Sequence, residues 1–522
     1  MLKKSCIYLI FLISLIANIY FAWQKSGFHE DEYYTYFSSN RSLGLYQPDR
    51  QWQDRQTILD EFTVREGEGF NYGLVKLVQS WDVHPPLYYF IFHTVCSFFG
   101  GLFSKWSGII TNLLAFCISF FILHKLLLKL HVNENLTLII MAFWSLNPQT
   151  ISCNMLIRMY AWLSVFIFAC AYSHVKLILT IREDSDKLLI KNYIIGNIVP
   201  IMVISYLGFL TQYFYLFFFV SIGFFTALWM FFAKKRYKET IIYVFACAVS
   251  LGLAVLSYPA SLSHIFGGYR GSDAAGSLFD FGNTYERITF FTGLLNDFVF
   301  AGGLSLLMII LILGIIYRMS KKYRRDKVHP EMIILVLGVV SHFLLTAKAA
   351  LLVGSASNRY EMPIYGLIIV LILMGIEHYF SEGKLKKYVV PVLATVLGIL
   401  LFKGLFIDGR VLFLYPEDRE KIAYAVQNQN EVAVVMFNPA TPHNVWRLTD
   451  ELIVYSEVYY MDEENTSAIT DDKLLAADKI VLYIADDDMQ TLALENITSS
   501  TGLTNLKKIS SEEMWVTYEL TK

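Results

Sequence analysis

The chain has 522 residues, of which 55% are hydrophobic and 17% are charged, and its mean hydropathy is +0.46. A soluble globular chain rarely reaches this hydropathy, so the composition excludes an ordinary soluble enzyme and predicts a membrane protein with several spans. The net charge of −2 hides an asymmetry, because residues 408–522 hold 9 Lys and Arg against 21 Asp and Glu, or −12, which leaves +10 for residues 1–407. We therefore expect a membrane domain over 1–407 and a soluble acidic domain over 408–522.

The N-terminal segment predicts a membrane anchor. Lys3 and Lys4 precede an apolar run that reaches residue 23, which is long enough to cross a bilayer. A secretory signal peptide has a similar pattern. Because no clear cleavage site of small residues precedes the charged residues that follow, we interpret the segment as an uncleaved anchor.

Directly after this anchor lies the acidic cluster Phe28-His29-Glu30-Asp31-Glu32. Charged side chains are costly in hydrocarbon, so these ionisable residues are expected at the edge of the bilayer. A carboxylate cluster at the outer face is where a general base for a lipid-linked substrate would be needed. The side chains are also of types that bind divalent cations, but sequential neighbours seldom all point inward and no second cluster completes a site. We predict no metal site, with a divalent cation as the alternative.

Basic clusters orient the membrane domain, because Lys and Arg concentrate in cytoplasmic loops. Such clusters lie near residues 125–129, 182–191, 234–236, 318–325 and 384–387. Between them we expect about eleven spans, with twelve or thirteen as the alternative, near residues 5–23, 107–128, 136–151, 156–178, 193–210, 214–232, 240–258, 293–317, 331–351, 362–380 and 389–406. The N-terminus is then cytoplasmic, and the acidic domain is extracytoplasmic.

A further apolar stretch, residues 87–103, does not fit this order of sides. If this stretch were counted as a span, basic clusters would fall on the extracytoplasmic side of the membrane. We therefore expect a juxtamembrane or re-entrant helix on the outer side. Pro85 and Pro86 suit its first turn, where proline is tolerated. The first outer loop, residues 24–86, leads into this helix.

The acidic domain has the pattern of a small α/β layer. Three apolar runs, 431–438, 453–461 and 479–485, predict β-strands. Residues 417–429, after Pro416, predict a helix.

The same orientation gathers polar residues on the outer face. Arg158, Tyr213 and Arg359 fall there, near the ends of expected spans. A charge at membrane depth is costly, so it is usually functional or paired. The alternative for each arginine is that it reaches out to lipid phosphate at the surface.

Five short segments resemble the motifs of a known family, the GT-C glycosyltransferases of the protein O-mannosyltransferase and aminoarabinose-transferase lineage, called glycosyltransferase family 39-like in bacteria. Their order and spacing match this family over essentially the whole membrane domain. The segments are Asp31-Glu32-Tyr33-Tyr34, Asp82-Val83-His84-Pro85-Pro86-Leu87-Tyr88-Tyr89, Arg158-Met159-Tyr160-Ala161, Leu210-Thr211-Gln212-Tyr213 and Arg359-Tyr360-Glu361-Met362-Pro363. The resemblance implies the GT-C fold, a donor sugar on polyprenyl phosphate, an acceptor that approaches from outside the cell membrane, and inversion at the anomeric carbon.

Such a transfer requires a base for the acceptor hydroxyl and positive charge for the departing phosphate. By resemblance, Asp31 is the candidate base and Glu32 is the second choice. Arg359 and Arg158 are candidates for phosphate binding, because the guanidinium fork matches phosphate oxygens. The remaining assignments are Tyr360 and Tyr213 to the donor lipid, and His84, Asp82 and Glu30 to positioning. For His84-Pro85-Pro86, a purely structural turn is an equal alternative.

The sequence therefore predicts an inverting hexosyl or pentosyl transferase that modifies a cell-envelope polymer, lipid or protein. The alternatives are a flippase or transporter of lipid-linked sugars, and a polysaccharide polymerase or ligase. A carrier would hold polar residues near the midplane of several helices, whereas here they collect at one face. The expected partners are the lipid bilayer, the lipid-linked donor, the acceptor, a polyprenyl-phosphate sugar synthase and a flippase, with no nucleic acid.

Overall fold

The structure is a computed structural model that describes residues 2–41, 46–183, 189–321, 329–512 and 514–522. The chain groups into two compact units, each built from separated segments. The helical unit comprises Met1–Trp23, Gln79–Ile91 and Gly108–Phe413, and the sheet unit comprises Gln24–Val78, Phe92–Ser107 and Leu414–Lys522. The sheet unit therefore takes in most of the loop 24–86 as well as the C-terminal segment.

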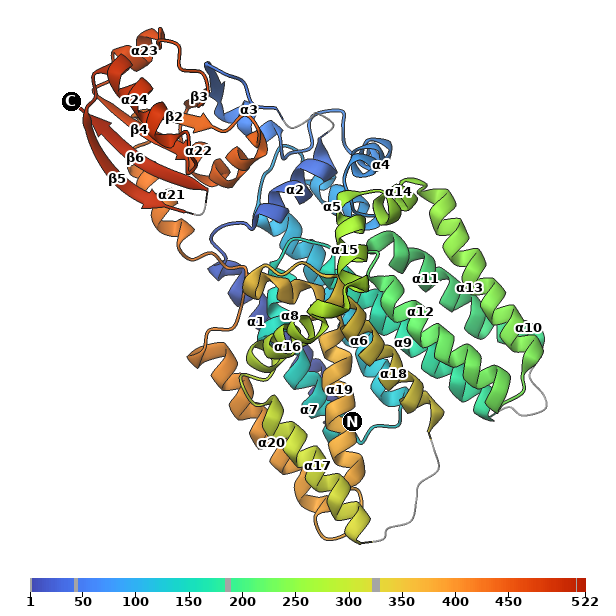
Figure 1. The fold of residues 1–522 in the computed structure, drawn as a ribbon. Helices are drawn as coiled ribbons and strands as arrows, with labels where there is room; N and C mark the ends of the chain where they lie inside the picture. Colours follow the sequence, from blue (N-terminus) through green and yellow to red (C-terminus); the bar gives the residue numbers. More distant parts are fainter. Residues whose placement is uncertain (1, 42–45, 184–188, 322–328, 513) are drawn as a thin grey trace. The chain divides into compact units, whose positions relative to one another are not determined.

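The helical unit consists mainly of long apolar helices (Figure 1). Among the described residues, nine helices are long and apolar enough to cross a membrane, or ten if one bent pair counts as a span. The nine are Ser5–Gln24, Lys105–Lys129, Tyr160–Glu183, Ile190–Thr211, Tyr215–Ala233, Tyr237–Ser257, Pro330–Ala349, Met362–Tyr379 and Lys386–Ile407. The bent pair is Phe281–Val299 with Leu304–Ser320, at 96°. The expected class, a polytopic α-helical membrane protein, is confirmed.

The helices of this unit in chain order are α1 (Leu2–Gln24), α6 (Lys105–Lys129), α7 (Glu134–Ser145), α8 (Pro148–Met155), α9 (Tyr160–Glu183), α10 (Ile190–Tyr193), η1 (Ile194–Ile198), α11 (Val199–Thr211), α12 (Tyr215–Leu228), η2 (Trp229–Ala233), α13 (Tyr237–Ser257), α14 (Ala260–Phe266), α15 (Tyr269–Phe279), η3 (Phe281–Asn283), α16 (Thr284–Leu294), η4 (Leu295–Val299), α17 (Leu304–Ser320), α18 (Pro330–Ala349), η5 (Gly354–Tyr360), α19 (Met362–Tyr379), α20 (Lys386–Phe402) and η6 (Lys403–Ile407).

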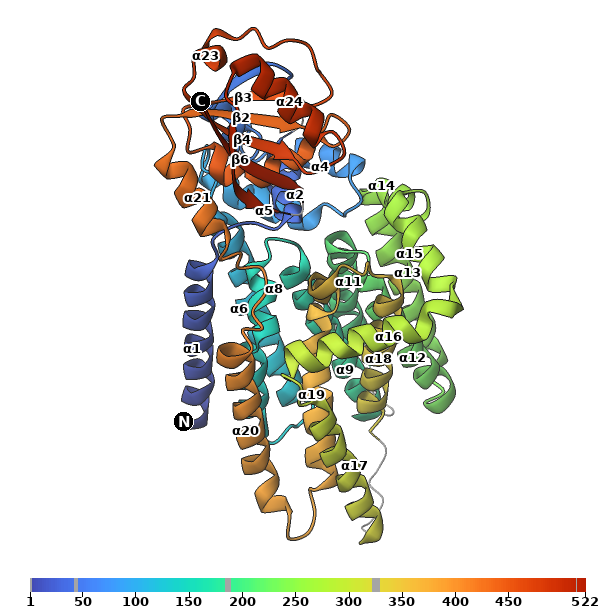
Figure 2. The ribbon, with the colours of Figure 1, turned by 60° about the vertical axis from the view of Figure 1, so that its left-hand side comes forward.

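Helix α9 forms the centre of the helical unit. It contacts α11, α12, α18 and α19, and 78% of its span is buried inside the protein, the largest share among the nine spans of the described chain. Helices α17, α19 and α20 run roughly parallel in Figures 1 and 2. This alignment is expected of helices that cross one bilayer.

One expected span, 136–151, is instead two shorter helices, α7 and α8. Pro148 occupies the first turn of α8, and proline disfavours a helical conformation at the residue before it. That residue, Asn147, caps α8 by accepting a hydrogen bond from the backbone N–H of Gln149 at 3.0 Å. Its amide also donates to the carbonyl of Val299 at 2.9 Å. The stretch 87–103 contains α5, whose twelve residues are too few to cross a bilayer.

Polar side chains tie α1 to its neighbours in the helical unit. The hydroxyls of Ser14 and Ser145 are 2.6 Å apart, and the amide of Asn154 donates to Asn18 Oδ1 at 2.8 Å. Hydrogen bonds of this kind satisfy polar groups inside an apolar bundle and fix the contact between helices.

The sheet unit contains a six-stranded sheet with the order β1-β3-β2-β4-β6-β5. Strands β3, β2 and β4 are parallel, and the outer pairings are antiparallel. The strands are β1 (Gln51–Asp54), β2 (Val432–Phe437), β3 (Glu457–Asp462), β4 (Lys479–Ala485), β5 (Asn505–Ser511) and β6 (Trp515–Thr521). The helices with residues in this unit are α2 (Glu30–Asn40), α3 (Arg55–Asp60), α4 (Tyr72–Trp81), α5 (Leu87–Phe98), α21 (Asp418–Gln427), η7 (Pro442–Leu448), α22 (Thr449–Leu452), α23 (Asp472–Leu475) and α24 (Gln490–Thr501).

Apolar side chains cover both faces of this sheet. Along β2, Ala433 and Val435 belong to one buried cluster, and Val434 and Met436 belong to the other. This assignment follows from the alternation of side chains along a strand. The predicted runs 431–438, 453–461 and 479–485 correspond to β2, β3 and β4, and the expected α/β layer is confirmed.

Candidate active site

A chain of hydrogen bonds joins Asp82, His84 and Arg158 in the helical unit. His84 Nδ1 lies 2.9 Å from Asp82 Oδ2, and His84 Nε2 lies 3.1 Å from an Arg158 guanidinium nitrogen. Arginine has only donors, so Nε2 of His84 must accept and its Nδ1 carries the proton that is donated to Asp82. In this arrangement His84 holds the Arg158 guanidinium in a fixed direction.

The charge of Asp82 belongs to the same arrangement. Burial alone would raise the pKa of Asp82, but the pairing with His84 and the charge of Arg158 outweigh burial and lower this pKa to about 2. Asp82 is therefore ionised at neutral pH. It fixes the tautomer of His84 and balances the positive charge of Arg158.

The backbone at the end of α8 positions Arg158. The amide of buried Asn112, on α6, donates to the carbonyls of Asn154 and Leu156 at 3.3 and 2.6 Å. The N–H of Arg158 donates to the carbonyl of Leu156 at 2.7 Å. These bonds satisfy carbonyls that the helix leaves without partners at its end, so the irregular turn is stable inside the protein.

Tyr213 is held by a histidine that the sequence motifs do not contain. The hydroxyl of Tyr213 lies 3.0 Å from His264 Nδ1, and His264 Nε2 lies 3.3 Å from the carbonyl of Ser80. The carbonyl can only accept, so His264 donates from Nε2 and accepts the Tyr213 hydroxyl at Nδ1. Burial lowers the pKa of His264, which favours this neutral form. Ser80 precedes Asp82 by two residues, so the two hydrogen-bonded chains share one segment.

Arg359 and Tyr360 lie at the end of η5, just before α19. Both are nearly buried, with 6% and 9% of their surface exposed. The Arg359 guanidinium lies 5.1 Å from the Tyr360 ring centroid and donates to the Tyr360 hydroxyl at 3.3 Å. The ring of Tyr360 also packs against Tyr160 and Phe214, at centroid distances of 5.9 and 5.7 Å. Two of the sequence motifs of the helical unit therefore meet at Tyr360, beside Phe214, the residue that follows a third motif.

Glu361, the next residue, is a buried carboxyl group. None of its surface is exposed, and within the described chain neither of its carboxyl oxygens has a hydrogen-bond partner. Burial raises the pKa of Glu361 well above its ordinary value. The sequence placed it beside Arg359 and Tyr360 but assigned it no role.

The acidic cluster begins α2 in the sheet unit, where its three carboxylates have different environments. Glu32 accepts from the backbone N–H of His29 at 2.5 Å and from Lys25 Nζ at 2.9 Å, and the side chains of Lys25 and Glu32 are fully buried. Glu30 lies 3.8 Å from Arg447. Asp31 keeps 29% of its side chain exposed and lies 3.7 Å from His29 Nδ1. Asp31 is thus accessible, whereas Glu32 forms a capping box with the N-cap residue His29 and pairs with a buried lysine.

The structure gathers some of the predicted site residues. Asp82, His84 and Arg158 are directly linked, and Tyr213 and Tyr360 belong to the same helical unit. Asp31 belongs to the sheet unit, so a site shared by Asp31 and Arg359 stays a prediction. Among the described residues, no group of three His, Cys, Asp or Glu side chains is arranged to hold a metal ion. A divalent cation stays the alternative stated from the sequence.

Comparisons with known proteins identify the fold. No family model matches the chain, and no curated protein matches its sequence. The oligosaccharyltransferase AglB from Archaeoglobus fulgidus, in complex with an inhibitory peptide and a dolichol-phosphate, is similar with a TM-score of 0.50 and 10% identity, covering 96% of this chain and 71% of that chain. ArnT from Cupriavidus metallidurans, bound to undecaprenyl phosphate, is similar with a TM-score of 0.49 and 11% identity, covering 99% and 98%.

These findings define the class of the protein. The chain is a multi-pass membrane protein. It has the GT-C fold, as its likeness to AglB shows, and the fold that the sequence motifs implied is confirmed.

Proposed function

We propose that the protein is an inverting glycosyltransferase that moves a monosaccharide, a hexose or a pentose, from a polyprenyl-phosphate donor to a cell-envelope acceptor on the outer face of the membrane. The observation that carries the proposal is the Asp82–His84–Arg158 chain, because it holds a buried guanidinium in one direction. The GT-C fold supports it, since AglB with this fold is an oligosaccharyltransferase in complex with a dolichol-phosphate.

The arginines are suited to the phosphate of the donor. A guanidinium presents a planar fork of N–H donors that matches phosphate oxygens, and a nearly buried site strengthens this attraction. Arg158 is oriented by His84, and Arg359 lies against the ring of Tyr360. Both residues precede a spanning helix, α9 or α19, and the rings of Tyr160 and Tyr360 pack against each other at a centroid distance of 5.9 Å.

Asp31 is the proposed base. Its carboxylate takes the proton of an acceptor hydroxyl while the oxygen attacks the anomeric carbon, and the bond from that carbon to the phosphate oxygen breaks. Polyprenyl phosphate leaves with the bonding electrons, and the arginines stabilise its negative charge. Attack from the side opposite to the leaving group inverts the anomeric carbon. The full burial of Glu32 in its pair with Lys25 favours Asp31 over Glu32 for this role.

The remaining parts of the proposal concern setting and partners. The N-terminus would be cytoplasmic and the sheet unit extracytoplasmic, as the basic loops indicate. A polyprenyl-phosphate sugar synthase would make the donor on the cytoplasmic side, and a flippase would deliver it. The acceptor would be a polymer, a lipid or a protein of the cell envelope.

The test compares Asp31→Asn with the unchanged protein, both purified in lipid nanodiscs. Removal of a general base is expected to lower transfer from undecaprenyl-phosphate-linked hexoses and pentoses by about 10²–10⁴-fold. The affinity for undecaprenyl phosphate should stay the same, because the arginines remain. Glu66→Gln, which changes an exposed carboxylate in the same unit, is the matched control. Undiminished transfer by Asp31→Asn would remove Asp31 from this role, and lipid flipping without transfer would favour the flippase.

A further inference from the structure

The sheet unit contains a pocket of about 680 Å³ that no step of the proposed transfer uses. It lies where β2 and β3 begin, at the end of the parallel strands opposite to their carboxyl ends. Ligand sites of open α/β sheets usually lie at the carboxyl ends. This pocket is therefore a feature of this chain and not a consequence of the sheet topology. Its volume falls within the range of small-molecule sites.

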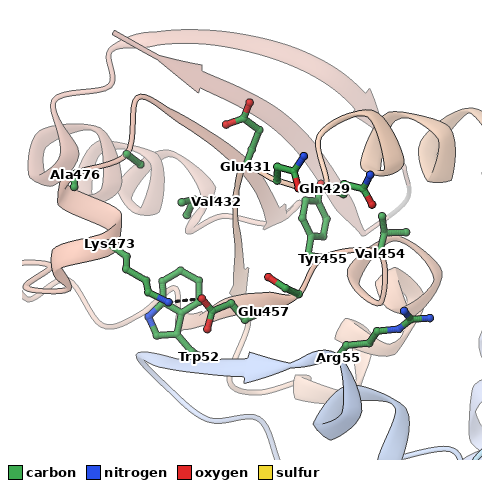
Figure 3. Close-up of a pocket in the computed structure, with 13 residues that line it drawn as sticks. Trp52, Arg55, Gln429, Glu431, Val432, Val454, Tyr455, Glu457, Lys473 and Ala476 are labelled. Carbon is green, nitrogen blue, oxygen red and sulfur yellow. Dashed lines mark hydrogen bonds and ion pairs between the residues drawn. The ribbon is translucent and has the colours of Figure 1, made fainter.

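Two separated segments of the chain form the walls of this pocket. Figure 3 shows Trp52 and Arg55 on the N-terminal segment, drawn in blue, and Gln429, Glu431 and Lys473 on the C-terminal segment, drawn in orange and red. The pairing of β1 with β3 brings the two segments together. The pocket therefore exists only when both segments are folded as one unit.

Trp52 gives the pocket a fixed aromatic surface. Its indole N–H donates to Asp471 at 2.9 Å, and its ring packs against Tyr459 at a centroid distance of 5.1 Å. The Lys473 ammonium lies 4.8 Å from the centroid of the Trp52 ring and pairs with Glu457. Lys473 is 61% exposed, and an exposed ion pair stabilises a protein by little. A ligand ring can therefore displace the lysine from the indole at small cost.

The charged side chains that line the pocket do not favour a charged ligand. Arg55 and Lys473 are positive, Glu431 and Glu457 are negative, and the other lining side chains are uncharged. The walls thus have no net charge, although residues 408–522 alone carry −12. A phosphate or a polyanion would meet two carboxylates, and a cation would meet Arg55 and Lys473. The balance favours a neutral ligand.

The polar groups match the hydroxyls of a sugar. Gln429 and Asn430 are exposed and offer amide donors and acceptors, and Ser456 offers a hydroxyl. Each sugar hydroxyl can donate and accept at once, so it can bridge such a mixed set. A sugar ring also has a face of C–H groups that packs well on an aromatic surface such as Trp52.

We propose that this pocket binds a neutral glycan of a few sugar units. The glycan packs one ring on Trp52 and hydrogen-bonds with Arg55, Gln429 and Glu431. Its binding does not depend on the transfer reaction. In the proposed transferase it would be a segment of the acceptor chain, held away from the reacting hydroxyl, and this role rests on the proposed function.

The experiment measures binding of neutral tetrasaccharides to the full chain in nanodiscs by calorimetric titration. The probes are tetramers of glucose, galactose, mannose, rhamnose and N-acetylglucosamine, with a hyaluronan tetrasaccharide as the anionic comparison. At least one neutral probe should bind saturably and more tightly than hyaluronan. Arg55→Ala and Gln429→Ala change exposed side chains, so they should fold, and each should weaken binding about five- to tenfold.

Matched controls separate the pocket from general effects. Gln56→Ala and Glu495→Gln change exposed residues outside the pocket and should bind as the unchanged protein does. Saturable binding to none of the neutral probes, unchanged binding by Arg55→Ala and Gln429→Ala, or binding of hyaluronan alone would each overturn the proposal. If Asp31→Asn keeps its glycan affinity while transfer persists undiminished, the proposed base fails and the pocket stands.

Discussion

At the scale of single residues, the hydrogen-bond directions decide what His84 does. It accepts from Arg158 and donates to Asp82, so its neighbours determine which ring nitrogen carries the proton. A histidine that took protons from substrate would need one of these two nitrogens. The geometry therefore favours a positioning role for His84 over a role as an acid or base.

Arg359 allows a direct test of phosphate binding. Arg359→Lys keeps the positive charge but loses the planar fork and the stacking on Tyr360, so the affinity for undecaprenyl phosphate should fall about tenfold. The measurement is equilibrium binding of undecaprenyl phosphate to the purified protein. Arg270→Lys is a matched control, because the guanidinium of exposed Arg270 lies 5.0 Å from the ring of its neighbour Tyr269. Equal losses in the two variants would contradict a specific role for Arg359.

The motif residues could be predicted from the sequence, whereas several of their partners could not. Asp82, His84 and Arg158 stand in short polar segments beside apolar runs, which marks them as unusual for a membrane protein. His264 and Asn112 have no such signal, because a single polar residue in a helix gives no information about the distant residue that it contacts. The burial of Lys25 was likewise missed, since a lysine that follows a span is expected at the surface.

At the scale of elements, α22 carries the clearest dependence on pH. Burial and the nearby Asp418 raise the pKa of Asp450 from 3.8 to about 7, although Lys25 and Lys105 act in the opposite direction. The folded state therefore holds this proton more tightly than the unfolded state. As pH rises from about 4 to 7, the unfolded state ionises first and the free energy of unfolding falls, by up to roughly 4 kcal/mol for this group.

Asp450→Asn should remove this loss. At pH 8 the variant should have a thermal midpoint several °C above that of the unchanged protein, and the difference should vanish well below pH 3.8, where the carboxyl is protonated in both states. Thermal unfolding of the sheet unit within the purified full chain, followed at both pH values, checks this. A difference that is independent of pH would show that folding does not shift the pKa of Asp450.

The long helices could be predicted from apolar length, and their breaks only in part. Pro148 signals the end of α7, but the same run also has the composition of a span. Strand β1 was not predicted. Its four residues, Gln51–Asp54, do not alternate between apolar and polar. The strand forms because it pairs with the edge of β3, which is distant in the sequence. Local pattern cannot reveal a strand that depends on a distant partner.

At the scale of the whole molecule, the sheet unit depends on segments from both ends of the chain. Ile58, on α3, belongs to the same buried cluster as β2 and β3 residues, and Phe37 packs against Trp446 at a centroid distance of 4.7 Å. Without the N-terminal segment, β3 would be an unprotected edge and these apolar side chains would meet water.

A fragment of residues 414–522 should therefore be unstable on its own. We expect its thermal midpoint to lie at least roughly 5 °C below that of a single chain in which residues 24–78 are linked to 414–522. Circular dichroism in the far ultraviolet, recorded during heating, measures both midpoints. If the two chains unfold at the same temperature, the N-terminal segment contributes nothing to the stability of the sheet.

The order of synthesis determines when β1 can pair with β3. β1 ends at Asp54 and β3 begins at Glu457, so at about 5–20 residues per second a ribosome needs roughly 20 to 80 seconds to make the second strand after the first. During that interval β1 has no partner strand, while the helices of the helical unit insert into the membrane. The nascent protein therefore completes its sheet last, and every truncated chain that is released early lacks it.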